Sequence, residues 1–386
     1  MASLLLPVIY LAFISLGLPD SLLGAAWPSI YPSLGVPLSW AGGISAIISA
    51  GTVVSALASD RLNGWLGTGK VTALSVAMTA AALFGFSCSS SYWQLCLWGI
   101  PYGLGAGSVD AALNNYVSLH YKSRHMSWLH CMWGVGASVG PMIMARALSG
   151  PGWTAGYRTI ALLQAGLTAI LVLSLPLWKR PQDAADGEAF TPEHRSLPEL
   201  FKVPGVPQVM LCFFCYCSLE STAGLWAASY CTLVRGIDAA TAAQWASLFY
   251  LGITVGRFFS GFLTMRISDR NMIRLGQGVI ALGLLLILLP LGSGVLFAGL
   301  ILLGLGCAPI YPCIIHETPA NFGRALSMAL TGLQMAFAYV GTCVMPPLFG
   351  LLADKISPAL YPWYMAVLLA VMFIMAEALH KKTAVR

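Results

Sequence analysis

Residues 17–28 read GLPDSLLGAAWP, which places Asp20 inside an apolar run that begins near the first residue. An ionised aspartate near the middle of a bilayer costs about 2.5–3.5 kcal/mol or more, so a membrane helix that carries one usually has a function for it. In a soluble core the cost would be similar, but the function would differ. The composition of the whole chain decides between these two settings.

The composition excludes a soluble protein. Hydrophobic residues make up 58% of the 386 positions, charged residues only 9%, and the mean hydropathy is +0.78. An average soluble domain has about 25% charged residues, which it needs to cover a surface that faces water. We therefore predict an all-α integral membrane protein. The start, MASLLLPVIYLAFISL, has no basic segment and no small-residue cleavage site before Asp20, so it reads as a first span rather than a cleaved signal peptide.

The number of spans follows from the apolar runs, because a spanning helix needs about 20 apolar residues. Polar and turn-forming breaks separate twelve runs: 4–32, 38–61, 70–88, 92–119, 125–149, 157–178, 207–234, 239–265, 272–290, 294–315, 325–353 and 359–379. An even number of spans places both termini on one side. Fifteen of the 20 Lys and Arg residues fall in the loops and tail of that side, four on the other side, and Arg257 inside a span. Because basic loops stay inside, we expect both termini to be cytoplasmic.

One long hydrophilic segment, KRPQDAADGEAFTPEHRSLPELFKVPGVPQ at 179–208, separates the sixth and seventh spans. Its mixed charges and its prolines are typical of a linker. We expect an N-terminal six-helix bundle at 1–178, a cytoplasmic linker at 179–206 and a C-terminal six-helix bundle at 207–386. Within the linker, SLPE at 196–199 can cap a short helix at the membrane surface.

The two halves repeat each other. DSLLG at 20–24 recurs as ESTAG at 220–224, and GLGAG at 103–107 recurs as GLGCA at 304–308. Two further matches, SWA with QWA and GTVVSALASDRL with GRFFSGFLTMRI, keep the same order at an offset of 205. Such a tandem duplication is typical of transporters whose binding site lies between two halves.

These features resemble the major facilitator superfamily. Twelve spans, a six-plus-six repeat and a short loop between the second and third spans carry the likeness. An acid in the first span, GLGAGSVDAALNNY at 103–116 and LHCMWGVGASVGP at 129–141 are similar, more narrowly, to its fucose:proton symporter-type sugar branch. The resemblance implies two pseudo-symmetric six-helix bundles with a central site that alternates between the two sides. DRLNGWLGTGK at 60–70 departs from the basic cluster that is usual in this loop of the superfamily.

Three acids at membrane depth are the candidates for ion coupling: Asp20, Asp110 and Glu220, the last being the repeat counterpart of the first. A carboxyl group in apolar surroundings can gain and lose a proton near neutral pH. A sodium ion would instead need several convergent oxygens, such as those of Asp20 or Asp110 with Asn114 and backbone carbonyls. The sequence leaves proton and sodium open. Arg257, inside the eighth span, is either a counter-ion for an acid or a structural contact to carbonyl groups.

The expected substrate is a small polar solute such as a monosaccharide. Planar polar groups hold hydroxyls, and flat aromatic rings stack on the C–H face of a sugar. The candidate substrate-binding residues are Trp27, Asn114, Asn115, His130, Trp133, Gln164, Trp226, Tyr311 and Gln334. Helix packing is the alternative role for each of them, above all for the amides and for His130.

Two local patterns predict structure rather than transport. Pro19 has no N–H and frees the carbonyl of Ser15, which predicts a kink beside Asp20. Glu377 precedes Lys381 by four residues, which predicts an ion pair within one helix.

Other functions fit the sequence less well. A proton-coupled exporter of amphiphilic compounds is the main alternative, because GVGASVGP at 134–141 partly resembles the antiporter motif of the fifth span. A sensor that has lost transport would not need acids in both halves. An enzyme is disfavoured, since no HExxH motif and no paired His/Asp metal spacing occur.

The remaining expectations concern ligands and setting. CFFCYC at 212–217 has no second ligand pair at zinc-finger spacing, so its cysteines are expected to pack and not to bind metal. We expect no cofactor. The net charge of +6 reflects the basic cytoplasmic loops, so it does not indicate a nucleic-acid partner. The expected protein is a monomer in the plasma or inner membrane, with the lipid bilayer, a small solute and a coupling proton or sodium ion as its partners.

Overall fold

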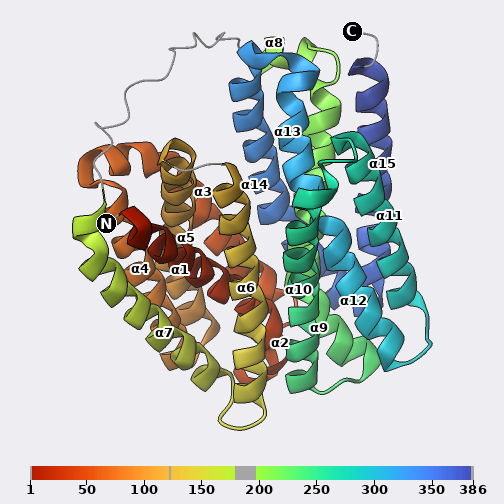
Figure 1. Cartoon of the computed structure of the whole chain (residues 1–386). Helices are drawn as coiled ribbons and strands as arrows, with labels where there is room; N and C mark the ends of the chain where they lie inside the picture. Colours follow the sequence, from red (N-terminus) through yellow and green to blue (C-terminus); the bar gives the residue numbers. More distant parts are fainter. Residues whose placement is uncertain (1, 121–122, 179–196, 384–386) are drawn as a thin grey trace.

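The computed structural model describes residues 2–120, 123–178 and 197–383. The described part of the chain is helical, with the membrane-length helices arranged side by side (Figure 1). The helices of the first half are α1 (Ala2–Asp20), α2 (Leu22–Leu34), α3 (Trp40–Leu66), α4 (Thr68–Cys88), α5 (Tyr92–His120), α6 (Ser123–Leu148) and α7 (Trp153–Ser174). Those that follow are α8 (Leu197–Lys202), α9 (Val206–Arg235), α10 (Ala239–Leu263), α11 (Asp269–Leu288), α12 (Ser293–Cys307), α13 (Ile310–Phe322), α14 (Arg324–Lys355) and α15 (Tyr361–Thr383).

These helices make twelve membrane spans, as the sequence predicts. The pairs α1–α2 and α12–α13 each form one span of two pieces. Among the described residues, ten segments are long and apolar enough to cross a membrane by composition. The other two spans are α5 and α6, with 29 and 26 residues, which are long enough but carry several polar residues along their length. These two helices hold much of the candidate site.

The first span is interrupted where the sequence predicts a kink. Helix α1 ends at Asp20 and α2 begins at Leu22, directly after Pro19. The break leaves the carboxylate of Asp20 at the end of a helix in mid-span. Ser21 lies at the break and donates its hydroxyl hydrogen to the carbonyl of Ala137 in α6, 2.8 Å away.

Each half is a bundle in which helices pack closely through glycines. In the first half, a Cβ atom at Gly17 would clash with the backbone carbonyl of Trp133, and one at Gly136 with that of Ile14. Helices α1 and α6 therefore touch backbone to backbone, as small residues permit in membranes. This contact fixes the position of Asp20 relative to Trp133.

The two halves meet along four pairs of helices: α6 with α10, α3 with α14, and α2 with both α9 and α10. Gly24 of α2 faces the carbonyl oxygen of Gly224, and an added Cβ would lie 2.5 Å from it. The hydroxyl of Ser39 donates to Asp354 Oδ2 at 3.2 Å. These contacts lie toward the end of the bundle that is opposite to both termini and α8, which we call the closed end (Figure 1).

The segment between the halves is described only from residue 197, so most of the expected linker lies outside the described residues. A short helix, α8, is present at Leu197–Lys202, where the sequence suggests one. Its expected cap at Ser196 falls outside the described residues.

The predicted partner of Glu377 is wrong. Its two carboxylate oxygens accept from Nε and Nη2 of Arg274, each at 2.6 Å, and Arg270 lies 3.7 Å away. Both arginines come from α11, which packs against α15. A bidentate guanidinium contact is stronger than a flexible Glu–Lys pair along one helix, so the tertiary partner replaces the local one.

Candidate functional site

Asp20 lies at the centre of the candidate site. Its side chain is exposed although Pro19 and Ser21 beside it are buried, so solvent reaches the middle of the first span. Two neutral groups donate to its carboxylate: the hydroxyl of Tyr102 to Oδ1 at 3.1 Å, and the indole N–H of Trp133 to Oδ2 at 2.8 Å. The carboxylate is thus held from α5 and from α6, and neither of these two partners carries a positive charge.

A chain of contacts runs from Asp20 into the other half. Trp133 donates to Asp20 from one edge of its indole, and the guanidinium of Arg257 lies 5.0 Å from the centre of the ring. Arg257 also forms an ion pair with Glu220, with 3.7 Å between Nη2 and Oε1. Asp20 and its repeat counterpart Glu220 are therefore connected through Trp133 of α6 and Arg257 of α10.

Arg257 lies within ion-pair distance of an acid in this structure. Its side chain and that of Glu220 are 16% and 20% exposed, so the pair is largely shielded from water. A partly buried guanidinium over an indole face gains a cation–π attraction of about 1–2 kcal/mol. Both interactions hold the arginine at the junction of the halves.

The third acid, Asp110, lies in α5 and is half-buried. Its Oδ1 accepts from Asn114 Nδ2 at 2.9 Å, and the same amide also donates to the backbone carbonyl of Asp110 at 3.0 Å. Asp110 interacts electrostatically with Asp20 and with Tyr311. The acid and amide that the sequence places on one helix face thus point into the same region as Asp20.

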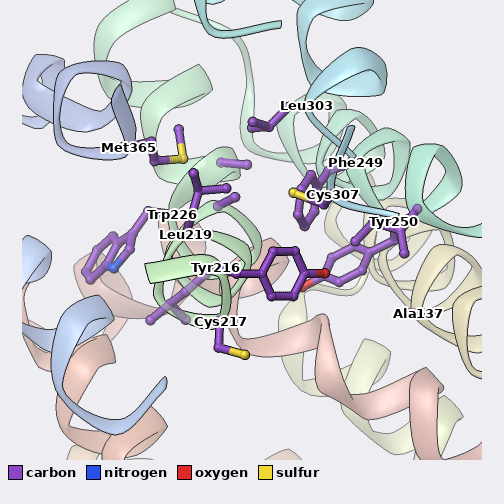
Figure 2. Close-up of a cluster of buried hydrophobic side chains, with 14 of the residues drawn as sticks. Ala137, Tyr216, Cys217, Leu219, Trp226, Phe249, Tyr250, Leu303, Cys307 and Met365 are labelled. Atoms are coloured by element: carbon purple, nitrogen blue, oxygen red, sulfur yellow. The ribbon is translucent and has the colours of Figure 1, made fainter. Parts of the chain in front are cut away.

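Aromatic side chains surround this polar group. Trp133 meets Tyr250 edge to face at 6.3 Å between ring centres, and Tyr311 lies 6.3 Å from Tyr216. Figure 2 shows Tyr216 and Tyr250 pointing toward one another from α9 and α10. His130 is half-buried and packs edge to face on Phe13 at 5.8 Å.

Several predicted substrate residues lie in the packed interior instead. Trp27 is 0% exposed and donates to the carbonyl of Leu38; Trp226 is 1% exposed and donates to that of Pro346. Figure 2 shows Trp226 on the side of α9 away from Tyr250. An indole buried in a bundle needs one acceptor for its N–H, and a backbone carbonyl of a neighbouring segment supplies it. Both tryptophans therefore pack helices together.

The two candidate glutamines are also buried. Gln334 is 0% exposed and exchanges hydrogen bonds with Thr318 Oγ1, at 3.1 and 3.3 Å, between α13 and α14. Gln164, likewise 0% exposed, donates to the carbonyl of Ser15 at 2.5 Å. That carbonyl is the one that Pro19 frees, so Gln164 satisfies it and supports the kink beside Asp20.

Of the remaining candidates, Tyr311 is half-buried and donates to Met335 Sδ at 3.5 Å. The side chain of Asn115 lies outside the described part of the chain. The sequence analysis missed Tyr102 and Tyr250. A usable signal existed for each, since Tyr102 lies eight residues before Asp110 and Tyr250 lies seven before Arg257, which keeps each pair near one face of its helix.

The family model of the Major Facilitator Superfamily matches residues 9–244 and 209–384. The chain belongs to this superfamily. The two matches together extend over residues 9–384.

Two curated relatives align with most of the chain. One is the bypass of stop codon protein 6 of Saccharomyces cerevisiae, 22% identical over 395 residues, which cover 92% of this chain and 79% of that protein. The other is the uncharacterized transporter y4wD of Sinorhizobium fredii, 23% identical over 344 residues, with 88% of each chain covered. Neither name states a substrate.

Solved structures share the fold. The nucleoside transporter NupG aligns with a TM-score of 0.78 at 14% identity, covering 97% of this chain and 98% of its own. A D-xylose–proton symporter gives 0.76 at 12% identity, covering 96% of both. A bacterial homologue of the human lysosomal transporter Spinster, in an inward-facing and occupied conformation, gives 0.70 at 12% identity, covering 99% and 97%. At such identities these structures establish the fold and leave the substrate open.

Proposed function

We propose that this member of the superfamily is an ion-coupled symporter of a small polar solute such as a monosaccharide, with Asp20 as the main coupling residue. The observation that carries the proposal is the carboxylate of Asp20, which is exposed to solvent at mid-span and held by two neutral donors. An acid kept in that position at a cost of several kcal/mol is suited to binding and releasing a cation.

The other charged groups support this role. Arg257 is paired with Glu220, which leaves Asp20 and Asp110 with neutral hydrogen-bond partners. Among these described residues there are three carboxylates and one guanidinium, so the region favours a cation that enters from outside. A proton binds to one carboxylate alone. A sodium ion would use Asp20 or Asp110 together with other oxygens, such as that of Asn114.

The proposed solute site uses the groups that remain accessible around Asp20. These are Asn114, His130, Trp133 and Tyr311, with Asn115 as a further candidate. An amide, an imidazole and an indole face suit a hydroxylated ring. Gln164, Gln334, Trp27 and Trp226 have packing roles and are left out of the proposed site.

Alternating access follows from the contacts between the halves. Contacts such as Ser39 with Asp354 and Gly24 with Gly224 keep the two bundles together at the closed end. We propose that solvent reaches Asp20 from the other end, where the termini lie. From the distribution of basic residues we propose that this is the cytoplasmic side, and that the protein works as a monomer in the plasma or inner membrane. The bundle of residues 1–178 would rock against that of residues 207–386.

An exporter of amphiphilic compounds is the second candidate. It is favoured by the aromatic surroundings of the acids, with Trp133, Tyr216, Tyr250 and Tyr311 in one region. The burial of two of the predicted amides also reduces the number of groups that would hold a sugar.

A ligand screen distinguishes these functions. Purified protein is heated with monosaccharides, disaccharides or lipophilic cations, with and without Na⁺, and the melting temperature is recorded, because a ligand that binds only the folded state raises it. Stabilisation by a few hexoses supports the symporter, and a Na⁺ requirement names the ion. Stabilisation by lipophilic cations alone contradicts it and favours the exporter.

The coupling role of Asp20 has its own test in liposomes, with the stabilising solute as the probe. We expect Asp20→Asn to abolish ion-driven accumulation while solute exchange stays measurable. The matched control is Asp238→Asn, which makes the same chemical change in the loop before α10. Accumulation by Asp20→Asn at the wild-type level would contradict the proposal.

A further inference from the structure

The two oxygens of Asp20 have chemically different partners. Oδ1 accepts from the hydroxyl of Tyr102 at 3.1 Å, and Oδ2 accepts from the indole N–H of Trp133 at 2.8 Å. A tyrosine hydroxyl can donate or accept a hydrogen bond, whereas an indole N–H can only donate. The two positions on the carboxyl group are therefore not equivalent for a proton.

A proton on Oδ2 would take one of the two lone pairs of the oxygen to which Trp133 donates. The hydroxyl oxygen of a carboxyl group is a poor acceptor, and the indole N–H cannot accept from it in turn, so most of the 2.8 Å hydrogen bond would be lost. A proton on Oδ1 requires only that the Tyr102 hydroxyl turn, so that it accepts from Asp20 instead of donating to it. Both hydrogen bonds of the carboxyl group then survive protonation, although the one from Trp133 weakens, since hydrogen bonds to a charged group are about twice as strong.

We propose that the proton enters and leaves Asp20 at Oδ1, and that Tyr102 and Trp133 are the positioning residues that determine this. This inference rests on the proposed function in its proton-coupled form. The proton comes from solvent water, forms one O–H bond with the carboxylate and returns to water on release, with no other bond made or broken. Tyr102 stays protonated throughout and changes only the direction of its hydrogen bond.

The position of Trp133 extends the effect to the other half. Because the guanidinium of Arg257 lies over the Trp133 ring and pairs with Glu220, the indole of Trp133 connects Asp20 of α1 to the other half. Proton binding at Oδ1 thus keeps both hydrogen bonds of the carboxyl group, while it weakens the bond by which Asp20 holds this indole.

Other titratable or charged groups lie around Asp20 and belong to the helices packed near it. They are Tyr102 and Asp110 of α5, His130 of α6, Tyr157 of α7, Glu220 and Tyr216 of α9, and Tyr250 and Arg257 of α10. A charge on Asp110 changes the pH at which Asp20 titrates. It leaves the hydrogen-bonding difference between Oδ1 and Oδ2 unchanged, so the test must read the bond and not only the pH midpoint.

Infrared difference spectroscopy between high and low pH reads that bond in the purified full-length protein and needs no transport substrate. Protonation of Asp20 produces a carboxyl C=O band, identified by its loss in Asp20→Asn. If the proton is on Oδ1, the C=O oxygen is Oδ2, which accepts from Trp133. Since a hydrogen bond lowers a C=O stretching frequency, Trp133→Phe should raise the frequency and Tyr102→Phe should leave it nearly unchanged. Tyr250→Phe is the matched control, because its ring packs on Trp133 without bonding to Asp20.

The opposite pattern overturns the inference: a higher frequency in Tyr102→Phe places the C=O on Oδ1 and the proton on Oδ2. Tyr102→Phe removes a single oxygen and decides the point even if Trp133→Phe fails to fold. A wild-type spectrum without any band that depends on Asp20 would overturn proton coupling at Asp20 itself, and the inference with it. The failure of the inference alone is thus distinct from the failure of the proposed function.

Discussion

The kink beside Asp20 makes a prediction whose sign can be worked out from hydrogen bonds. Gln164 Nε2 donates to the Ser15 carbonyl that Pro19 leaves free, while Gln164 Oε1 is buried without a partner among the described residues. Gln164→Met has a similar volume and removes both polar atoms. The wild type then has one unsatisfied buried acceptor, Oε1, and the variant also has one, the Ser15 carbonyl. The two proteins therefore differ by one hydrogen bond, so we expect Gln164→Met to lower the free energy of unfolding by about 1 kcal/mol.

The same substitution should behave differently without the proline. In Pro19→Ala the new N–H of residue 19 can donate to the Ser15 carbonyl, as in an unbroken helix. A carbonyl oxygen has two lone pairs, so Gln164 then shares its acceptor and is no longer needed to satisfy it. Adding Gln164→Met to Pro19→Ala should therefore cost clearly less than in the wild-type background, because no carbonyl is left unsatisfied.

The measurement is a double-mutant cycle on four purified proteins, with unfolding followed by tryptophan fluorescence at several concentrations of denaturing detergent. A loss of 1 kcal/mol corresponds to a shift in melting temperature of about 2 °C or less in a chain of this length, so replicates are needed. The matched control is Gln334→Met, a buried glutamine in the other half that Pro19→Ala should not affect. Equal effects of Gln164→Met in both backgrounds would refute the assignment of Gln164 to the kink.

Three further predictions concern other parts of the molecule. Arg257→Lys keeps the charge opposite Glu220 but loses the planar contact with Trp133, so we expect the free energy of unfolding to fall by about 1 kcal/mol in a thermal unfolding assay. This loss should be absent in a Trp133→Leu background. Asp238 caps α10 by accepting from the Thr241 N–H at 2.9 Å, and hydrogen bonds from the side chain and the N–H of Thr241 lower the pKa of Asp238. The cap should therefore stabilise the folded protein at pH values above the unfolded pKa of Asp238, near 4, and this stabilisation should be lost as the pH falls through the lower folded pKa. Asp238→Asn should flatten the pH dependence of stability. Asp238→Ala should lower the free energy of unfolding by about 1 kcal/mol at neutral pH. The double variant Ser39→Cys/Asp354→Cys should form a disulfide that holds the closed end shut and stops transport, and reduction should restore transport. Mass spectrometry checks that the disulfide has formed. Full transport by the cross-linked protein would contradict the assignment of the closed end.

The sequence by itself determined the features that depend on local composition. Twelve apolar runs of spanning length, the repeat of DSLLG in ESTAG and the break after Pro19 are visible in short windows, because bilayer thickness and helix geometry act on neighbouring residues. The acids at membrane depth also stand out without a structure, since their burial is costly wherever they point.

The tertiary structure decided which side chains belong to the site. Tyr102 reaches Asp20 across 82 positions and Gln164 reaches Ser15 across 149, whereas the local pair expected for Glu377 gave way to Arg274, 103 positions away. Most described membrane helices of this chain are apolar around most of their surface, so periodicity does not show which face of a helix meets the centre, the lipid or a neighbour. The rotation and close approach of the packed helices settle this, and they turned two predicted glutamines and two predicted tryptophans into packing residues while bringing Tyr102 and Trp133 to the two oxygens of Asp20.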